Sequence, residues 1–356
     1  MSKLDSIIIG NGIASHVMLF HLSLTLLEYE SRVNLPRKIL ILDSPIAKTC
    51  SLFSTAHAGT INARDGISPL GDMIKKSYQK FSHFVEQNNP EGVYKGQLYK
   101  SYDISDQVRP ELNKSQIFLP SILCSDQIFY GYKATHHFLD PAIFLNWLQS
   151  EYLKTFKSLS VELEYQAIHI DNLSFDSLTQ EYSLESEGSS LKSPFVILTS
   201  GIELFTQWTN ENWSYPKLTS RDGDYLYIDN IDLGKESFSL MMESTNVVYR
   251  HFSKQLLLGG STNQPGEYIS SPNHKELQFF HKEFKQYFPE LPDYDKFKME
   301  RGARVRGPKR YPFAGELHPG LFGMLGLYKN GFTFPFLMAP NLAQLMIQKY
   351  FLKRKS

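Results

Sequence analysis

The sequence has few cysteines, no excess of either charge and no long uninterrupted apolar run. Two cysteines, Cys50 and Cys124, cannot form a disulfide framework or a closed zinc site, and so low a content suits a reducing compartment. Lysine and arginine together number 37, as do aspartate and glutamate, so no overall field attracts nucleic acid or an anionic membrane. The apolar segment 13–27 is interrupted by His16 and His21, and it falls short of the roughly 18 residues of a membrane span. These absences predict a cytoplasmic protein without a membrane or nucleic-acid partner.

Metal-binding patterns are also missing. The 11 histidines show neither the HxH nor the HExxH spacing, so no metal site is expected. The locally basic tail with Lys353, Arg354 and Lys355 is interpreted as a solvated helix end, where cations suit the helix dipole.

The composition is that of an ordered globular protein. Hydrophobic residues make up 42% of the chain, with 25 phenylalanines and 20 tyrosines, whereas disordered chains are poor in aromatic residues. At 356 residues the chain exceeds a typical single core. One large domain or two interleaved domains are therefore expected.

The N-terminal part reads as a strand, a glycine turn, a helix and a second strand. The apolar run 4–9 has the length of a strand, and the segment 13–27 that of a buried helix. A second buried strand, 38–42, ends at Asp43. This order predicts a parallel βαβ unit.

The turn between strand and helix departs from the GxGxxG pattern of dinucleotide-binding proteins. Gly10 permits a tight turn and Gly12 lets the backbone approach a pyrophosphate at the helix N-terminus. Ser15 replaces the third glycine, which serves helix packing, so access to phosphate stays open. Asp43 follows the second strand, where a carboxylate can bind ribose hydroxyls, although its spacing from the turn exceeds the usual ~20 residues. We interpret the turn as a dinucleotide site; a helix N-terminus that binds nothing is the alternative.

The rest of the chain alternates in character. Asp140 and Pro141 open an expected helix, and the segment 193–201 reads as a buried strand closed by Gly201. The segments 92–104 and 225–260 are aromatic and alternating, which favours an antiparallel sheet. We therefore predict an α/β (α+β) fold: a Rossmann-like domain, discontinuous in sequence, with an inserted antiparallel β-rich domain. The expected boundaries are 1–85, 135–210 and 300–356 for the first domain and 86–134 and 211–299 for the second.

Several segments together resemble the D-amino-acid oxidase and glycine oxidase family of FAD-dependent oxidoreductases. They are IIIGNGIAS, ILILD, SLFSTAHAGTIN, LDPAIFLNWL, FVILTSG, TSRDGDYL, GARVRGPKRYPFAG and GLYKNGFT, which span nearly the whole chain. Three positions depart from the family pattern. Asp224 stands where glutamine is usual, Leu327 replaces a histidine and Lys329 an arginine.

The resemblance implies non-covalent FAD and a set of residues that contact it. Neither cysteine lies in the C-terminal turn where some relatives attach flavin. The implied cofactor-binding residues are Gly10, Gly12, Ile13, Ala14, Ser15, Asp43, Ser51, Ser54, Thr55, Gly201, Gly302, Gly326, Asn330, Gly331, Phe332 and Thr333. Ser51, Ser54 and Thr55 taken singly are equally well explained as parts of a polar loop.

Two cations are implied to act on the substrate. Arg304 is the leading ligand, because a guanidinium holds a carboxylate through two hydrogen bonds; an arginine paired with a surface carboxylate is the alternative. Lys329 is interpreted as a second carboxylate contact or as a cation near the flavin. His57 lies in the segment that resembles the one passing the flavin, but a core or solvent histidine is the preferred interpretation.

The family resemblance implies hydride transfer from the α carbon of a small amino acid or secondary amine to flavin N5. The alternatives are oxidation of a 2-hydroxy acid, action on a modified tRNA, and a flavoprotein without catalytic activity. The expected partner is a small molecule that bears a carboxylate. The choice between oxygen and another electron acceptor is left open.

Overall fold

The computed structural model describes most of the chain. The described residues are 4–44, 50–52, 54–60, 63, 66–101, 115–117, 129–186, 188–201, 213, 216–242, 245–260 and 271–352. Cys124 and the basic residues Lys353, Arg354 and Lys355 lie outside them. Within these ranges no helix is long and apolar enough to cross a membrane, and no three histidine, cysteine or acidic side chains are placed to hold a metal ion.

Five longer helices and eighteen strands are described. The helices are α1 (Ile13–Glu28), α2 (Pro69–Asn88), α3 (Pro141–Ser158), α5 (His274–Tyr287) and α6 (Phe334–Met346). The strands are β1 (Ser6–Ile9), β2 (Lys38–Asp43), β3 (His57–Ala58), β4 (Val93–Ser101), β5 (Ser115–Ile117), β6 (Phe129–Leu139), β7 (Glu162–Ala167), β8 (Asn172–Asp176), β9 (Glu181–Ser186), β10 (Ser189–Ser193), β11 (Val196–Leu198), β12 (Thr219–Ile228), β13 (Ser237–Met242), β14 (Thr245–Arg250), β15 (Gln255–Gly260), β16 (Lys298–Arg306), β17 (Phe313–His318) and β18 (Leu321–Leu325). Short 3-10 turns include η5 (Pro308–Arg310) and η6 (Tyr328–Asn330).

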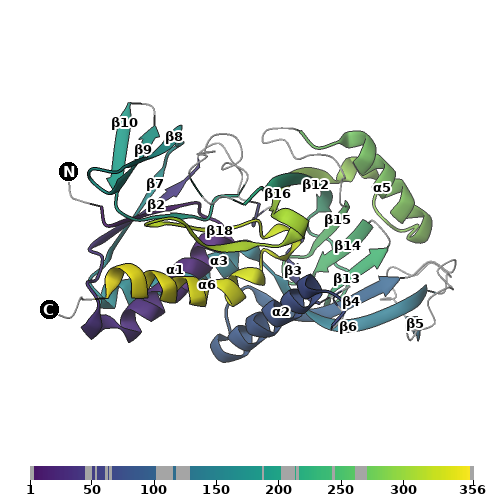
Figure 1. The fold of residues 1–356 in the computed structure, drawn as a ribbon. Helices are drawn as coiled ribbons and strands as arrows, with labels where there is room; N and C mark the ends of the chain where they lie inside the picture. The colour runs from purple at the N-terminus through teal and green to yellow at the C-terminus, as the bar shows by residue number, and fades with distance from the viewer. Residues whose placement is uncertain are drawn as a thin grey trace.

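A six-stranded sheet forms the centre of one half of the molecule. Its order is β17-β18-β11-β1-β2-β7, and all neighbours are parallel except the β17–β18 pair. Helices α1, α3 and α6 cover one face, and the three-stranded sheet β10-β9-β8 lies on the other (Figure 1). The buried strands read as continuous apolar runs because both faces are covered.

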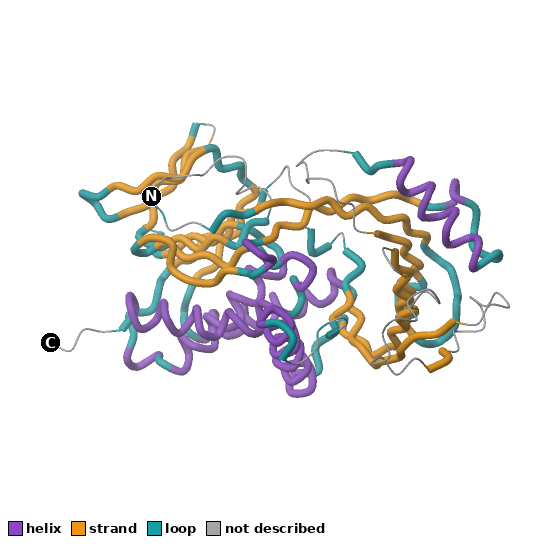
Figure 2. Tube along the Cα trace, turned by 45° about the vertical axis from the view of Figure 1, so that its right-hand side comes forward, coloured by secondary structure: helices purple, strands orange, loops and turns teal. Residues whose placement is uncertain are grey.

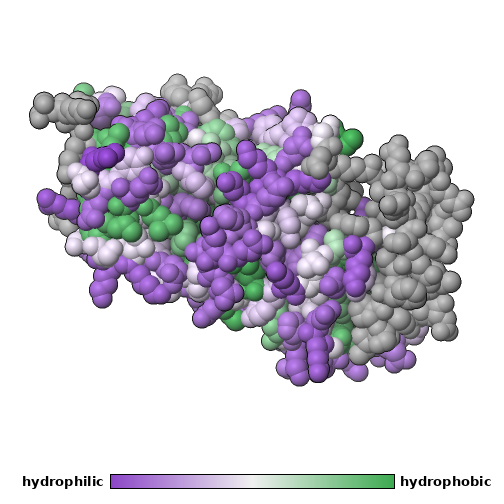
Figure 3. All heavy atoms as spheres, turned by 90° about the horizontal axis from the view of Figure 1, so that it is seen from below, coloured by the Kyte–Doolittle hydropathy of each residue, from purple (hydrophilic) through white to green (hydrophobic). Residues whose placement is uncertain are grey.

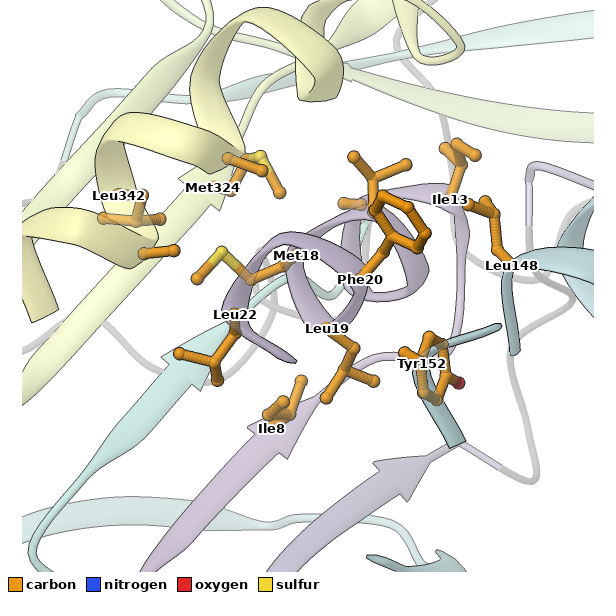
Figure 4. Close-up of a cluster of buried hydrophobic side chains, with 14 of the residues drawn as sticks. Ile8, Ile13, Met18, Leu19, Phe20, Leu22, Leu148, Tyr152, Met324 and Leu342 are labelled. Carbon is orange, nitrogen blue, oxygen red and sulfur yellow. The ribbon is translucent and has the colours of Figure 1, made fainter. Parts of the chain in front are cut away.

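Two apolar cores follow from this layering. On the helix side, residues from β1, α1, α3, β18 and α6 point toward one another, among them Ile8, Met18, Leu148, Met324 and Leu342 (Figure 4). On the other side the alternate strand residues pack against the three-stranded sheet. The side chains of β1 thus contribute to both cores, as the period of a strand requires.

The other half is built on a nine-stranded sheet. Its main path is β16-β12-β15-β14-β13-β4-β6-β3, with β5 paired to β6, and only β13 and β4 run parallel. Helix α5, which was not among the expected elements, packs on one face through Leu277, Phe280 and Phe284. The opposite face carries Phe138, Tyr225, Val248 and Leu257 and does not belong to that core.

The predicted fold class is confirmed as a mixed α/β architecture with a β-rich second part. Helix α3 begins as expected, because the Asp140 side chain accepts a hydrogen bond from the Ile143 amide at 3.2 Å and Pro141 occupies the first turn. The division into domains stays a prediction. Two of its expected boundaries, 134/135 and 299/300, fall inside strands β6 and β16.

The two halves lie side by side along the long dimension of the molecule. Figure 2 shows most helices gathered in one half and α5 alone at the far end of the other. Seen from below, the described surface is largely hydrophilic, with apolar residues in separate groups (Figure 3).

Candidate functional site

The carboxyl ends of four parallel strands meet at one edge of the six-stranded sheet. Strands β2, β1, β11 and β18 are consecutive neighbours in register. Their ends bring together the segment 10–12, Asp43, the segment 199–201 and the segment 326–333. Ligands of open α/β sheets bind outside this edge.

The turn after β1 requires a glycine at position 10. Gly10 has a φ of +116°, and a Cβ there would lie 2.8 Å from the backbone nitrogen of Ser200. At the N-terminus of α1 the Ile13 amide donates to the Ser51 hydroxyl at 3.0 Å. Ser15 is buried and its hydroxyl donates to the Gly12 carbonyl at 2.7 Å, so the missing third glycine costs no unsatisfied group.

Asp43 is held by a residue that the sequence analysis did not single out. The Asn11 amide donates to the Asp43 carboxylate at 3.1 Å, which joins the β1 turn to the end of β2. The carboxylate is half-buried at the carboxyl end of β2, the position from which dinucleotide-binding folds bind a ribose. In the sequence, this role of Asn11 is indicated only by its position between the two glycines and by its side-chain hydrogen-bond donor.

The segment 51–57 links the two halves. The Ser54 hydroxyl donates to the Ser51 carbonyl at 3.3 Å, and the Ser54 carbonyl accepts from the Arg250 guanidinium at 2.7 Å. Arg250 is 7% exposed, and burial lowers its pKa to about 10. Thr55 is half-buried beside this contact. The expected cofactor segment is therefore tied to β14 of the large sheet.

The end of β11 presents hydroxyl groups at the same edge. The Thr199 hydroxyl donates to the Ile9 carbonyl at 2.9 Å, which fastens β11 to β1. The Ser200 hydroxyl is buried and has no hydrogen-bond partner in the described part of the chain. Above Gly201 none of the described atoms would lie within 4 Å of an added Cβ.

The turn between β18 and α6 reaches the N-terminus of α1. Gly326 has a φ of +70°, and a Cβ there would lie 2.8 Å from the Gly307 nitrogen. The Asn330 carbonyl accepts from the Thr333 amide at 3.0 Å, and a Cβ on Gly331 would lie 3.8 Å from the Ile13 side chain. Phe332 and Thr333 are buried. The N-termini of α1 and α6 thus open at one edge.

These residues fit an FAD molecule. The two helix N-termini direct their positive ends to the edge of the sheet, as suits a pyrophosphate. The buried Ser200 hydroxyl has no hydrogen-bond partner among the described residues, and a ligand could supply one. The backbone at Gly10 lies so close to Ser200, just after β11, that a side chain at position 10 would not fit. The expected residues of the segments 10–15 and 326–333, with Asp43 and Gly201, lie along this edge, and Ser51 reaches it through the Ile13 amide. Ser54 and Thr55 lie in the segment that contacts Arg250, and Gly302 pairs with Gly223 in the large sheet.

Arg304 lies on the face of the large sheet that α5 does not cover. It pairs with Arg221 across the β12–β16 ladder, and its guanidinium lies directly over Gly223, where any Cβ would overlap Nη2. Burial raises the pKa of the nearby Cys50 thiol, and the positive charge of Arg304 partly opposes this rise. Gly223 therefore creates the space that Arg304 occupies, a role that needs the tertiary structure to be seen.

Lys329 and Arg304 both lie near the aromatic ring of Tyr328. The Arg304 Cζ lies 5.9 Å and the Lys329 Nζ 5.7 Å from the centroid of the Tyr328 ring. Burial, followed by the charges of Arg304 and Arg310, lowers the pKa of Lys329 to about 8, although part of its side chain remains exposed. Tyr328 has a φ of +50°, which is unusual for an aromatic residue.

Two of the departures from the family pattern have structural explanations. Asp224 is 1% exposed and accepts two hydrogen bonds from Arg301, at 2.6 and 2.8 Å, and a third from the Asn273 amide at 2.7 Å. It therefore joins β12, β16 and the start of α5. Leu327 forms a backbone bridge with Arg306, and its side chain packs on the helix-side core.

His57 is neutral in this environment. Burial and the charge of Arg250 lower its pKa to about 4, and its Nδ1 is buried without a hydrogen-bond partner among the described residues. It pairs with Phe138 across the β3–β6 ladder, so it lies at the edge of the large sheet next to the segment 51–55.

The comparisons with known proteins agree with this geometry. The family model described as FAD dependent oxidoreductase (DAO) matches residues 5–345. Among solved structures, glycine oxidase from Geobacillus kaustophilus is 15% identical over 100% of both chains, with a TM-score of 0.69. Iminodiacetate oxidase from Chelativorans sp. BNC1 is 13% identical over 98% of this chain and 97% of the other, with a TM-score of 0.68. L-α-glycerophosphate oxidase from Mycoplasma pneumoniae is 14% identical over 100% and 97%, with a TM-score of 0.72. No curated protein matches the sequence.

Proposed function

Because this chain belongs to the DAO family of FAD-dependent oxidoreductases, we propose that it oxidises the carbon–nitrogen bond of a small amino acid or secondary amine that bears a carboxylate. The cofactor is FAD. Two of the solved structures that share the fold carry the names glycine oxidase and iminodiacetate oxidase, whose named substrates are a primary and a secondary amine with carboxylates.

The observation that supports this proposal is the position of Arg304. Its guanidinium lies over Gly223 on the face not covered by α5, and it meets the turn after β18 at Tyr328. A guanidinium can hold a carboxylate through two parallel hydrogen bonds, which fix orientation as well as charge. A carboxylate held there leaves the neighbouring carbon directed toward the turn that closes the cofactor edge.

The chemistry itself needs few protein groups. When bound, FAD accepts a hydride from the substrate carbon, and the neutral amine becomes an imine after losing its proton. The protein has to bind the carboxylate, exclude water and hold the reacting carbon in place. Lys329 contributes a second cation at the same turn.

The test is anaerobic mixing of the yellow holoprotein with panels of amino acids, secondary amines and 2-hydroxy acids. Bleaching of the flavin absorption by an amine that bears a carboxylate is the expected result. Bleaching only by amines without a carboxylate would exclude the role of Arg304, and bleaching by none would exclude the reaction. Acid precipitation should release the flavin into solution, because the attachment is proposed to be non-covalent.

Oxidation of a 2-hydroxy acid is a second candidate, which the state of His57 favours. A hydroxyl group needs a base to accept its proton, and the half-buried His57, with a pKa lowered to about 4, is an unprotonated imidazole at pH 7, although a weaker base than an ordinary histidine. A His57→Gln variant separates the two reactions. It should leave reduction by an amine within a few-fold of wild type, whereas reduction by a hydroxy acid should fall by two orders of magnitude or more, the typical contribution of a positioned base.

A further inference from the structure

Arg250 is a buried cation that is hydrogen-bonded only to neutral groups. It lies at the end of β14 and is 7% exposed. Its Nη2 donates to the Ser54 carbonyl at 2.7 Å and its Nη1 to the Gln255 side-chain oxygen at 3.0 Å, while Nε is buried without a hydrogen-bond partner in the described part of the chain. A buried charge in such surroundings costs stability. Stabilising the sheet therefore does not explain an arginine at this position.

The Ser54 carbonyl belongs to a segment that joins the two halves of the molecule. At one end of the segment 51–58 the Ser51 hydroxyl accepts the Ile13 amide at 3.0 Å, at the N-terminus of α1. At the other end β3 pairs with β6 of the large sheet. The hydrogen bond from Arg250 reaches the segment between these two attachments.

The backbone between the two attachments is not in a relaxed conformation. Ala56 has a φ of +39°, in the left-handed region that is unfavourable for alanine because of its Cβ. A residue keeps such a conformation only where the surrounding contacts impose it. The Ala56 carbonyl accepts from the Leu139 amide at 2.9 Å, and Arg250 holds Ser54 two residues earlier. These two contacts fix the course of the segment.

The direction of the guanidinium is set by the large sheet. Gln255, which accepts from Nη1, lies opposite Arg250 in the β14–β15 ladder, and its amide donates to the Asp229 carboxylate at 2.9 Å. Asp229, the residue after β12, also accepts from the Lys298 ammonium at 2.9 Å. Side chains from three strands or their ends thus direct the guanidinium toward Ser54.

We infer that Arg250 is a positioning residue for FAD: it holds the segment 51–58 so that the Ser51 hydroxyl stays on the N-terminus of α1, beside the cofactor edge. A hydrogen bond from a charged donor is stronger than one between neutral groups, which suits a contact that fixes two halves of a molecule. The inference concerns the cofactor, so it does not depend on which substrate bond the protein oxidises.

The experiment measures the FAD affinity of the holoprotein on dilution, from the flavin fluorescence that returns when the cofactor dissociates. Arg250→Met keeps a long unbranched side chain and removes its hydrogen bonds. The Kd for FAD should rise about tenfold or more, because hydrogen bonds of charged groups are the strong ones. Arg250→Lys can still donate to the Ser54 carbonyl and should recover part of the affinity. An unchanged Kd in Arg250→Met would overturn the inference.

Urea unfolding distinguishes a positioning residue from a structural one. Each variant is unfolded at an FAD concentration that is the same multiple of its own Kd, so that bound FAD adds equal stability to all of them. Because methionine leaves no buried charge, the midpoint of Arg250→Met should equal or exceed that of wild type. A lower midpoint, or a variant that does not fold, would assign Arg250 to the fold and overturn the inference.

A double variant tests whether Arg250 acts through Ser51. Ser51→Ala alone should weaken FAD binding, because it removes the contact with the N-terminus of α1. Adding Arg250→Met should then cause no more than about a twofold further loss, since the contact that Arg250 positions is already absent. Losses that multiply in the double variant would show that the two residues act independently and would contradict the inference.

The matched control is Lys254→Met. Lys254 lies in the turn between β14 and β15 and forms an exposed ion pair with Asp232 at 3.3 Å. Its replacement removes a cation from the same hairpin without touching the segment 51–58, so the Kd for FAD should stay as in wild type. An equal loss of affinity in Lys254→Met and Arg250→Met would assign the effect to the charge of the hairpin and contradict the role of Arg250.

Discussion

Arg301 and Arg304 lie three residues apart on β16, yet their surroundings differ completely. Arg301 faces Asp224, a buried carboxylate that accepts two of its hydrogen bonds and also receives the Asn273 amide. Arg304 faces a glycine and lies near two other cations, Arg310 and Lys329. An offset of three positions places the two side chains on opposite faces of the strand, because side chains alternate between faces.

The comparison separates a structural arginine from the one proposed to bind the substrate carboxylate. Arg301 is on the α5 side, where its charge is neutralised within the fold and joins three elements. Arg304 is on the uncovered side, where Gly223 gives it room. Residue type and strand are the same, so the neighbours decide the role.

The largest expected effect is on the Arg301 side. Asp224→Ala removes a fully buried carboxylate from the partly buried Arg301 guanidinium, and breaking a buried ion pair typically costs about 3–5 kcal/mol of stability. Urea unfolding of the FAD-loaded protein measures the loss, and Asp229→Ala, which breaks the more exposed Lys298 pair, should cost about 1 kcal/mol or less. If both variants unfold at the same urea concentration, Asp224 does not hold the sheet to α5.

On the Arg304 side the effect should fall on the reaction and not on the fold. Arg304→Ala should slow flavin reduction by about one to two orders of magnitude, because a hydrogen bond to a charged group contributes roughly 1.5–3 kcal/mol. FAD content and unfolding should stay as in wild type. Arg304→Lys should recover only part of the rate, since an ammonium keeps the charge but loses the planar fork. Stopped-flow reduction provides the rates, and an unchanged rate in Arg304→Ala would make the two arginines functionally alike.

Gly223→Ala tests whether the glycine serves Arg304. The added methyl would overlap the end of a flexible side chain, so the guanidinium should move while the sheet stays folded. We expect a loss of up to about tenfold in substrate affinity, or about 1.4 kcal/mol. In an Arg304→Ala background the same change should have no further effect. Additive losses in the double variant would show that Gly223 acts independently.

The smallest effect is a pH dependence that belongs to Lys329. With a pKa of about 8, the ammonium proposed to contact the substrate carboxylate is present at pH 7 and is lost as the pH rises. Affinity for a carboxylate-bearing amine that reduces the flavin should therefore fall several-fold between pH 7 and pH 9, and a bound anion will shift the fall upward because it favours the charged amine. Lys329→Met should show no such step. A step of the same size in this variant would assign the titration to another group.

Much of the fold could be predicted from local patterns. The apolar runs 4–9 and 38–42, the glycines between them and the Asp140–Pro141 start of α3 are all short-range signals, and the structure has β1, α1, β2 and α3 at these places. Helix α5 was not predicted, because the segment before it has the pattern of strands and because its packing partners lie on β12 to β15. Its hydrophobic face is buried only by a sheet whose strands come together in the folded protein, and the sequence does not show that pairing.

The candidate site divides in the same way. Gly10, Asp43 and the turn 326–333 could be named because each follows a strand of a parallel sheet, whose carboxyl ends meet at one edge. Asn11 on Asp43 and the Ser51 hydroxyl on the Ile13 amide could not, since each joins residues more than thirty positions apart.

The sequence by itself determined the parallel sheet and the FAD family and made Arg304 the candidate substrate ligand, because periodicity, glycine spacing and motif resemblance are properties of neighbouring residues. Tertiary structure alone decided that Asp224 is a buried partner of Arg301, that Gly223 makes room for Arg304, and that Arg304 and Lys329 both lie near the Tyr328 ring. The physical reason is that burial and charge depend on the full set of neighbours in space. Strand pairing and packing, and not the order of residues along the chain, bring those neighbours together.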